Sequence, residues 1–272
     1  MGPFFCDAKL EKLFSLPCII GLHICRWWYA FHLSRNYHYL SGMKIQILGT
    51  RGEIDESAPW HSKHSGVLIN DELMIDLGEE SFLEYNPGFV LFSHFHPDHA
   101  YFMRKNNSLK QKIQAYGPEK PEELNDVSVV DKPFDKNGYH ITPIPVIHSL
   151  KVKSLAYLIE KDGKRLLYTG DIAWIEKQYQ DTFGQLDAVI TEGSFIEKGG
   201  MIRRDKKSGK IFGHTGIPDI VRVFSQYTDC IVFMHFGSWF MEDVEAARNK
   251  IQDLSSRNIT LHPARDGEII QI

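Results

Sequence analysis

The chain has 272 residues, of which 43% are hydrophobic, enough for one large domain with a substantial core. Its formal net charge is −4, and this acidic balance disfavours a general surface for duplex nucleic acid. The four cysteines are not spaced as in a disulfide or zinc-finger framework, so a reducing cytoplasm is the expected compartment and Cys230 is expected to be a small core residue.

Residues 1–42 differ in composition from the rest of the chain. Their apolar run, 13–25, is broken by Pro17 and His23, which makes it too short and too interrupted for a membrane span. It also lacks a convincing signal-peptide cleavage site. Because Met43 directly precedes the first expected strand, the preferred interpretation is an extension from a mis-assigned start, with the main domain over 43–272. A lid helix, an interfacial anchor and an export signal are the alternatives.

From residue 44 onward, expected strands alternate with expected helices, which favours an α/β domain. The apolar patterns predict strands over 44–49, 65–70, 72–76, 89–92, 140–148, 155–159, 165–168, 188–191, 230–234, 259–261 and 268–272. Helices are expected over 98–105, 175–183, 217–226 and 241–255. Pro143 and Pro145 favour an edge position for the strand that contains them.

The densest group of metal-ligand side chains follows the expected strand 89–92 and consists of His94, His96, Asp98 and His99. Neutral imidazole and carboxylate are the usual ligands of zinc and similar ions. Pro97 resists continuation of the strand and can open a helix, so Asp98 and His99 can turn away from the two preceding histidines. This arrangement favours two adjacent metal ions over one.

The pattern His-x-His-x-Asp-His resembles that of the metallo-β-lactamase superfamily of metal-dependent hydrolases. Four further elements follow the superfamily's order, each after a strand: Asp76, His148, Asp171 and His235. The resemblance implies a four-layer αββα sandwich, with two mixed sheets flanked by helices. It also implies two divalent metal ions, zinc or manganese.

The resemblance divides the ligands into two sets. One ion would be held by His94, His96 and His148, and the other by Asp98, His99 and His235. Asp171 would bridge them, and Asp76 would orient a ligand histidine through its other ring nitrogen. The alternative for Asp76 is a turn residue at a strand end.

Two further motifs are similar to those of the ribonuclease Z branch, Glu192-Gly-Ser-Phe and Gly-His214-Thr-Gly. In that branch a His and a Glu form a proton-donating pair, which makes His214 and Glu192 catalytic candidates together with Asp98. Alternatively, His214 begins a helix and Glu192 ends a strand. The stretch between His148 and Asp171 leaves no room for the long arm of ribonuclease Z, so the chain more closely resembles the compact phosphodiesterases of this group.

A basic segment lies between these two motifs. It contains Arg203, Arg204, Lys206 and Lys207, flanked by glycines. The functional interpretation is a flap that grips substrate phosphate. The alternative is a solvated flexible loop.

Together these features predict a dinuclear phosphodiesterase that uses metal-activated water on a nucleotide, a cyclic phosphate or a short RNA. A hydrolase of a lactone or thioester on the same site is the first alternative, and a non-hydrolytic metal-sensing or redox protein is the second. We expect no membrane partner, and a homodimer is one expectation for assembly.

Overall fold

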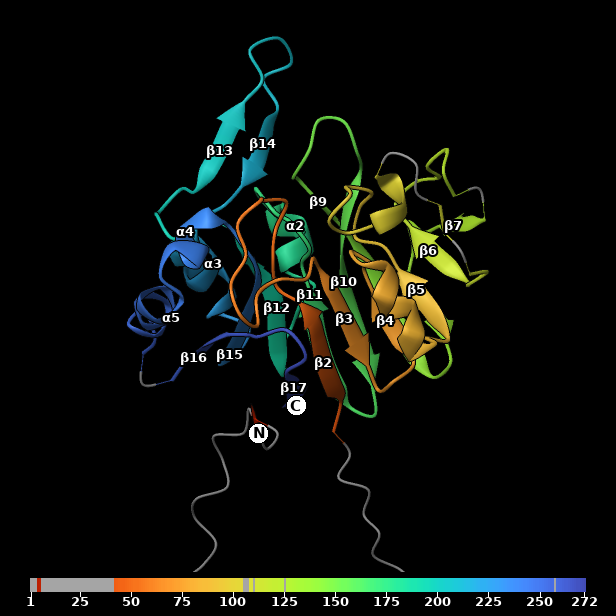
Figure 1. The fold of residues 1–272 in the computed structure, drawn as a ribbon, viewed down its shortest axis with the longest axis horizontal. Helices are drawn as coiled ribbons and strands as arrows, with labels where there is room; N and C mark the ends of the chain where they lie inside the picture. Colours follow the sequence, from red (N-terminus) through yellow and green to blue (C-terminus); the bar gives the residue numbers. More distant parts are fainter. Residues whose placement is uncertain (1–3, 6–41, 105–107, 110, 125, 257) are drawn as a thin grey trace, which may run out of the picture.

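The computed structural model describes residues 4–5, 42–104, 108–109, 111–124, 126–256 and 258–272. Strands dominate, and they form two large mixed sheets and one separate hairpin (Figure 1). In order across the first sheet lie β1 (Phe4–Phe5), β17 (Ile269–Gln271), β2 (Lys44–Gly49), β3 (Gly66–Ile69), β4 (Leu73–Ile75), β5 (Phe89–Leu91), β6 (Ala115–Gly117) and β7 (Val127–Val129).

The second sheet and the hairpin contain the remaining described strands. The sheet order is β16 (Thr260–Pro263), β15 (Cys230–Phe236), β12 (Ala188–Gly193), β11 (Lys164–Tyr168), β10 (Ser154–Lys161), β9 (Tyr139–Val146) and β8 (Phe134–Lys136). The hairpin pairs β13 (Met201–Arg204) with β14 (Ile211–His214) and projects from the body of the molecule (Figure 1).

The core between the two sheets is built from alternate residues of their strands. Ile45 and Ile47 of β2 pack in one buried cluster with Tyr157 and Ile159 of β10. The intervening residues face outward, so Leu158 of β10 belongs to a second buried cluster on the outer side of its sheet. The expected sandwich of two packed mixed sheets is confirmed, because strands buried on both faces need a covering layer on each side.

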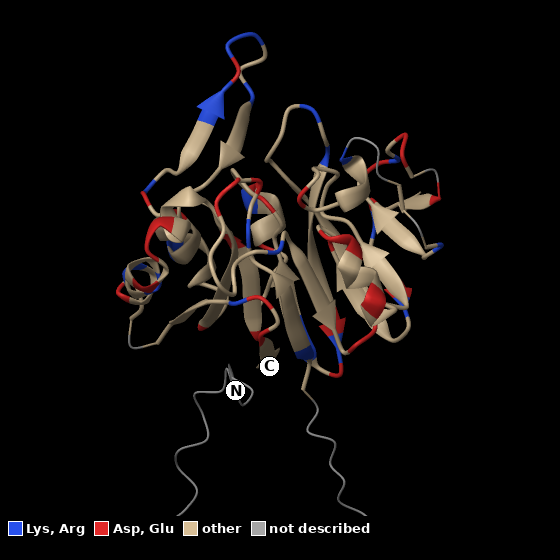
Figure 2. Ribbon diagram, viewed as in Figure 1, with Lys and Arg blue, Asp and Glu red and all other residues tan. Residues whose placement is uncertain are grey.

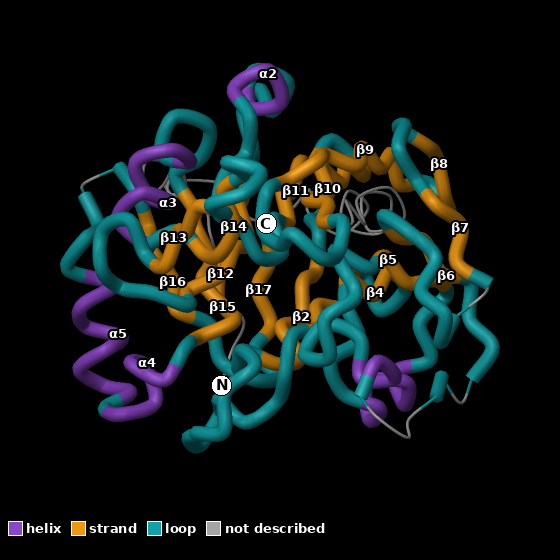
Figure 3. Tube along the Cα trace, turned by 90° about the horizontal axis from the view of Figure 1, so that it is seen from above, coloured by secondary structure: helices purple, strands orange, loops and turns teal. Residues whose placement is uncertain are grey.

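The two outer layers differ from each other. α3 (Ile217–Phe224) and α5 (Val244–Gln252) cover the second sheet. Over the first sheet, the described residues form only short 3-10 helices, Glu80–Tyr85 and Tyr101–Met103, with loops around them. Seen from above, the helices lie at the periphery of the molecule, while loops cross over the strands (Figure 3).

The expected helices are present but shorter than predicted. The helix expected over 98–105 is a 3-10 turn, and the one over 175–183 is only α2 (Lys177–Gln180). The expected helix 241–255 is two helices, α4 (Ser238–Glu242) and α5, separated at Asp243, whose side chain caps α5 by accepting from the Ala246 amide.

The edge position expected for β9 is wrong, because β9 lies between β8 and β10. β8 pairs only with Tyr139–Ile141, however, so the half of β9 with Pro143 and Pro145 has no strand on that side. The prolines therefore remove no hydrogen bond from the sheet.

Three expectations concern residues 1–42 and the compartment. Phe4 and Phe5 pair with β17, while 6–41 lie outside the described residues, so the extension and its mis-assigned start stay predictions. No described helix is long and apolar enough to cross a membrane.

Cys230 is buried in the core as expected, but it is disulfide-bonded. The cytoplasmic compartment, which was inferred from the lack of a disulfide framework, therefore also stays a prediction.

Candidate metal centre

All seven expected metal ligands converge at one end of the two packed sheets, from loops that are far apart in the sequence. His94, His96, Asp98 and His99 follow β5, while His148 follows β9 and Asp171 follows β11. His235 lies in β15 with a positive φ of 54°. Such strain in a non-glycine residue is typical of a functional position, because the surrounding structure must enforce it.

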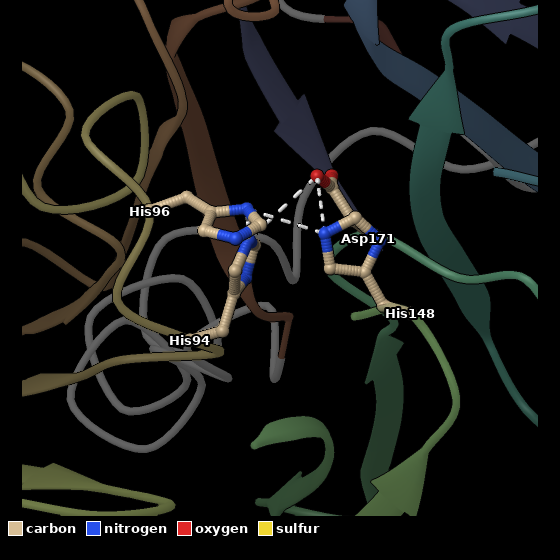
Figure 4. Close-up of side chains that lie close together, drawn as sticks. All are labelled: His94, His96, His148 and Asp171. Atoms are coloured by element: carbon tan, nitrogen blue, oxygen red, sulfur yellow. Dashed lines mark hydrogen bonds and ion pairs between the residues drawn. The ribbon is translucent and has the colours of Figure 1, made fainter. Parts of the chain in front are cut away.

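The first cluster consists of His94, His96, His148 and Asp171. The Nδ1 atom of His96 lies 3.0 Å from His94 Nε2 and 3.3 Å from His148 Nε2. The Oδ2 atom of Asp171 lies 3.7 Å and 3.6 Å from the same two Nε2 atoms. Figure 4 shows the three imidazole rings turned toward this carboxylate. Three imidazoles and one carboxylate oxygen therefore surround a single point.

The second cluster consists of Asp98, His99, His235 and the same Asp171. Here the other oxygen of Asp171, Oδ1, lies 3.3 Å from His99 Nε2 and 3.4 Å from His235 Nε2. Asp98 Oδ2 lies 2.8 Å from His235 Nε2. Each oxygen of Asp171 thus faces a different cluster, which is the arrangement expected of a bridging carboxylate.

The donor atoms of these clusters fit a divalent cation. His99 Nε2 and Asp171 Oδ1 are buried, lie 3.3 Å apart, and among the described residues have no partner in hydrogen-bond geometry. Buried polar atoms without a partner are costly unless a ligand satisfies them. Imidazole nitrogens and carboxylate oxygens at this density match the ligand preferences of zinc and similar ions.

A layer of hydrogen bonds around the clusters sets which nitrogen of each ring is free. Asp76, also at a positive φ of 58°, accepts from His99 Nδ1 at 2.7 Å. It also accepts from Tyr168 Oη at 2.7 Å and from the backbone and side chain of Ser93. The structure therefore places the Asp76 carboxylate against the Nδ1 atom of His99, where a residue that orients this ring is expected. The Nε2 atom of His99 is left facing Asp171.

Two more ligand rings are held in the same way. His148 Nδ1 lies 3.1 Å from the Gly213 carbonyl, while the Gly213 amide donates to the His148 carbonyl at 2.7 Å. His235 Nδ1 lies 3.0 Å from Ser194 Oγ. These contacts leave the Nε2 atoms of both rings for the clusters.

The two clusters differ in the protonation of their histidines. Burial lowers the pKa of His94 and His148, and lowers that of His96 to about 4. Burial also opposes protonation of His99 and His235, but Asp171 and Asp98 outweigh it and raise the pKa of both rings. Protons on these two rings occupy the place that a cation would take, so metal binding at the second cluster should release them.

His214 and Glu192 form a close pair beside the clusters. His214 Nδ1 lies 2.7 Å from Glu192 Oε2 and 4.0 Å from Asp171 Oδ2. Glu192 is buried, and its other oxygen accepts from the Ile172 amide at 2.6 Å. Burial of His214 opposes protonation, but the Glu192 carboxylate overcomes it and raises the pKa of His214 to about 9. Its Nε2 atom is left to carry a proton toward the cavity.

Two adjoining cavities open at these residues and share His96, His148, Met201 and His214. The larger, of about 370 Å³, is here named the aromatic chamber; it is also lined by Asp98, Asp171 and His235 and by Glu53, Ile54, Phe195 and Trp239. The smaller, of about 210 Å³, is named the arginine chamber and is also lined by Ser149, Arg203, Phe212 and Gly213.

The basic segment is the β13–β14 hairpin with its turn, not an irregular loop. Met201 pairs with His214 and Arg203 pairs with Phe212, so these four residues share the face that lines the cavities. Arg204 lies on the other face and donates to the Gly209 carbonyl. Arg204, Lys206 and Lys207 line neither cavity. Figure 2 shows basic residues gathered along β13 and at the tip of the hairpin.

Several site residues were not singled out from the sequence. Tyr168 donates a hydrogen bond to Asp76 from 92 positions away in the sequence. No local sequence pattern distinguishes such a tyrosine from one that only packs in a buried strand. Ser93 directly precedes the His-x-His-x-Asp-His motif and Ser194 lies within the Glu192-Gly-Ser-Phe motif, so these motifs gave the available signal. Trp239 and Ile54 line the aromatic chamber from loops that only the fold brings together.

Comparison with solved structures agrees with this architecture. The Bacillus subtilis metallo-beta-lactamase fold protein YhfI is 18% identical, with a TM-score of 0.62 over 85% of this chain and 100% of its own. A diphosphatase from the PhnP family is 12% identical, with a TM-score of 0.60 over 85% of this chain and 97% of its own. Human tRNase Z, short form, is 16% identical, with a TM-score of 0.54 over 84% of this chain and 98% of its own.

These identities establish a shared fold and no more. No curated protein matches the chain in sequence. A family model described as a beta-lactamase superfamily domain matches residues 86–236, more than half of the chain and a range that contains all seven clustered ligands. The chain therefore belongs to the beta-lactamase superfamily and has the metallo-beta-lactamase fold.

Proposed function

We propose that this protein is a metal-dependent phosphodiesterase that hydrolyses a nucleotide, a cyclic phosphate or a short RNA. The observation that carries the proposal is the His214–Glu192 pair, which lies 4.0 Å from the bridging carboxylate and lines both chambers. A phosphodiester that leaves as an alkoxide needs a proton as its bond breaks, and this pair can supply one. Hydrolysis of an ester with a good leaving group needs no such donor.

The proposed metal site uses all seven converging residues. His94, His96 and His148 would hold one ion and Asp98, His99 and His235 the other, with Asp171 shared between them; zinc and manganese are the candidate metals. When bound, such ions supply Lewis-acid stabilisation of phosphoryl oxygens and lower the pKa of a water.

The protein's own residues would perform the remaining steps. Glu192 holds His214 Nδ1, so the ring presents Nε2–H to the cavity. Hydrolysis joins the oxygen of a water to phosphorus, releases one proton of that water to solvent and breaks one P–O ester bond. The proton on His214 Nε2 passes to the leaving oxygen, and a proton from solvent then restores the imidazolium. Ile172, through its amide, keeps the Glu192 carboxylate in place.

The first experiment is a substrate screen of the purified metal-loaded protein. Bis-(p-nitrophenyl) phosphate, cyclic nucleotides and a dinucleotide test the phosphodiesterase proposal, while a lactone and a thioester test the alternative hydrolase. Turnover of the lactone or thioester alone would overturn the proposal.

The second experiment tests the proton donor. His214→Ala should lower kcat on an alkyl phosphodiester by about 10²–10⁴-fold, the usual contribution of general acid catalysis. The loss should be much smaller with a p-nitrophenyl leaving group, which departs without protonation. His140→Ala, at an exposed histidine paired with Asp135, is the control and should not change either rate. Equal losses on both substrates would mean that His214 positions phosphate instead.

A further inference from the structure

The two chambers offer a substrate different chemistry on the two sides of the ligand histidines. Apart from the clustered residues, the aromatic chamber is lined by Ile54, Phe195 and Trp239, which provide apolar and flat surfaces. Glu53 and His214 are its other ionisable side chains, and His214 also lines the second chamber. An aromatic group such as a nucleobase fits this apolar and flat lining.

The arginine chamber has the opposite electrostatic character. Its lining contains one guanidinium, that of Arg203, and no carboxylate. Ser149 also lines this chamber, and its hydroxyl can donate a hydrogen bond. Arginine recognises phosphate and carboxylate groups through paired N–H donors, so this chamber suits an anionic group.

The register of the hairpin determines which basic residue reaches the chamber. Successive side chains of a strand point to opposite faces. Arg203, paired with Phe212, is therefore on the cavity side, while Arg204, paired with Ile211, is on the other. Both are exposed residues of the same strand. The hairpin is anchored at this point, because Gly213 exchanges hydrogen bonds with His148.

We propose that Arg203 selects substrates that carry a second anionic group next to the scissile phosphodiester. This inference rests on the proposed function. The substrate would place its scissile phosphorus at the shared histidines, a nucleobase in the aromatic chamber and a terminal phosphate in the arginine chamber. Among the classes named above, this favours a short oligonucleotide with a terminal phosphate over a cyclic mononucleotide, which has a single phosphate.

The kinetic test compares dinucleotides that differ only in a terminal phosphate. The substrates are UpU, its 5′-phosphorylated form and its 3′-phosphorylated form. Each is incubated with the metal-loaded protein, and chromatography measures the rate of its hydrolysis. We expect kcat/KM to be about tenfold higher for one phosphorylated form than for UpU, because charge-assisted hydrogen bonds to an exposed guanidinium typically contribute about this much. Arg203→Ala should reduce this ratio to about one, and 0.5 M salt should weaken it.

Arg204→Ala is the matched control and should keep the wild-type ratio. The inference is overturned if the wild-type protein shows no preference, if Arg203→Ala keeps it, or if both variants lose it equally. The last result would mean that the hairpin acts through its overall charge.

A binding measurement separates this inference from the proposed function. Adenosine 3′,5′-bisphosphate and adenosine 5′-monophosphate are titrated into the metal-loaded protein in a calorimeter. Tighter binding of the bisphosphate in wild type and in Arg204→Ala, but not in Arg203→Ala, supports the second anion site even if no phosphodiester is hydrolysed. Turnover of phosphodiesters without this difference overturns the inference and leaves the proposed function standing.

Discussion

Two regions meet at the cavities, the metal-ligand clusters and the β13–β14 hairpin, and they differ in burial and in support. Six of the seven clustered ligands are buried, and several of their rings are held by a further hydrogen bond. Residues 201–204 of the hairpin are all exposed, and its tip lies away from both sheets (Figure 1). The comparison indicates that the packed fold holds the clusters in place, while the hairpin beside them is an exposed element whose side chains can change without disturbing that fold.

The largest effect should come from the residue that both clusters share. Asp171→Ala removes one oxygen from each cluster, so bound metal should fall from about two equivalents to less than one. Elemental analysis of protein purified without chelator measures this, and the same variant should lose hydrolytic activity. Asp187→Ala, at a partly exposed carboxylate that pairs with Lys164, is the control. Retention of two equivalents in Asp171→Ala would contradict the bridging role.

A smaller effect should follow from the hydrogen bonds around the cluster. Asp76→Asn keeps the size of the side chain but removes the charge that holds His99 Nδ1. Metal affinity should fall about 10–100-fold, as is usual when a partner of a metal ligand is replaced. Competition with a chromophoric chelator measures it, and Asp135→Asn at the surface should leave the affinity unchanged. An unaltered affinity in Asp76→Asn would show that packing alone orients His99.

Gly213 tests where the rigid region ends, because it belongs to the hairpin and contacts His148. Its φ is 111°, and a Cβ there would lie 2.1 Å from the Met201 carbonyl oxygen. Gly213→Ala should therefore cost about 1–3 kcal/mol of stability and also reduce metal affinity through His148. Gly209 has a φ of 71°, but a Cβ there would meet nothing within 4 Å. Gly209→Ala should therefore strain only the hairpin turn and leave metal affinity unchanged. Equal metal affinity in the two variants would mean that the clusters do not depend on the hairpin.

The smallest effect should come from the hairpin tip. The double substitution Lys206→Ala and Lys207→Ala removes two exposed charges that line neither chamber. The free energy of unfolding should change by no more than about 0.5 kcal/mol, and metal content should not change. Urea unfolding and elemental analysis measure these two quantities. A large rise in KM for the substrate would show that the tip contacts it after all, and would extend the substrate-binding region beyond Arg203.

The sequence by itself predicted the fold family, through motifs that resemble those of a known superfamily, and it singled out the residues that gather in the two clusters. His94 and His96 are two positions apart after a strand, so their side chains leave it on one side. His148, Asp171 and His235 each follow or end an apolar strand pattern, and strand ends in such folds converge. His214 and Glu192 were identified from their motifs, and the structure places their side chains in contact.

Only the tertiary structure decided how these residues are supported and which basic residue lines a cavity. The bond from Tyr168 to Asp76 and the exchange between His148 and Gly213 join segments that lie 92 and 65 positions apart. The separation of Arg203 from Arg204 depends on the pairing register of β13 with β14, which a shift of one residue would reverse. Local sequence patterns specify strand, turn and ligand type, but long-range packing specifies which face of each strand meets the cavity.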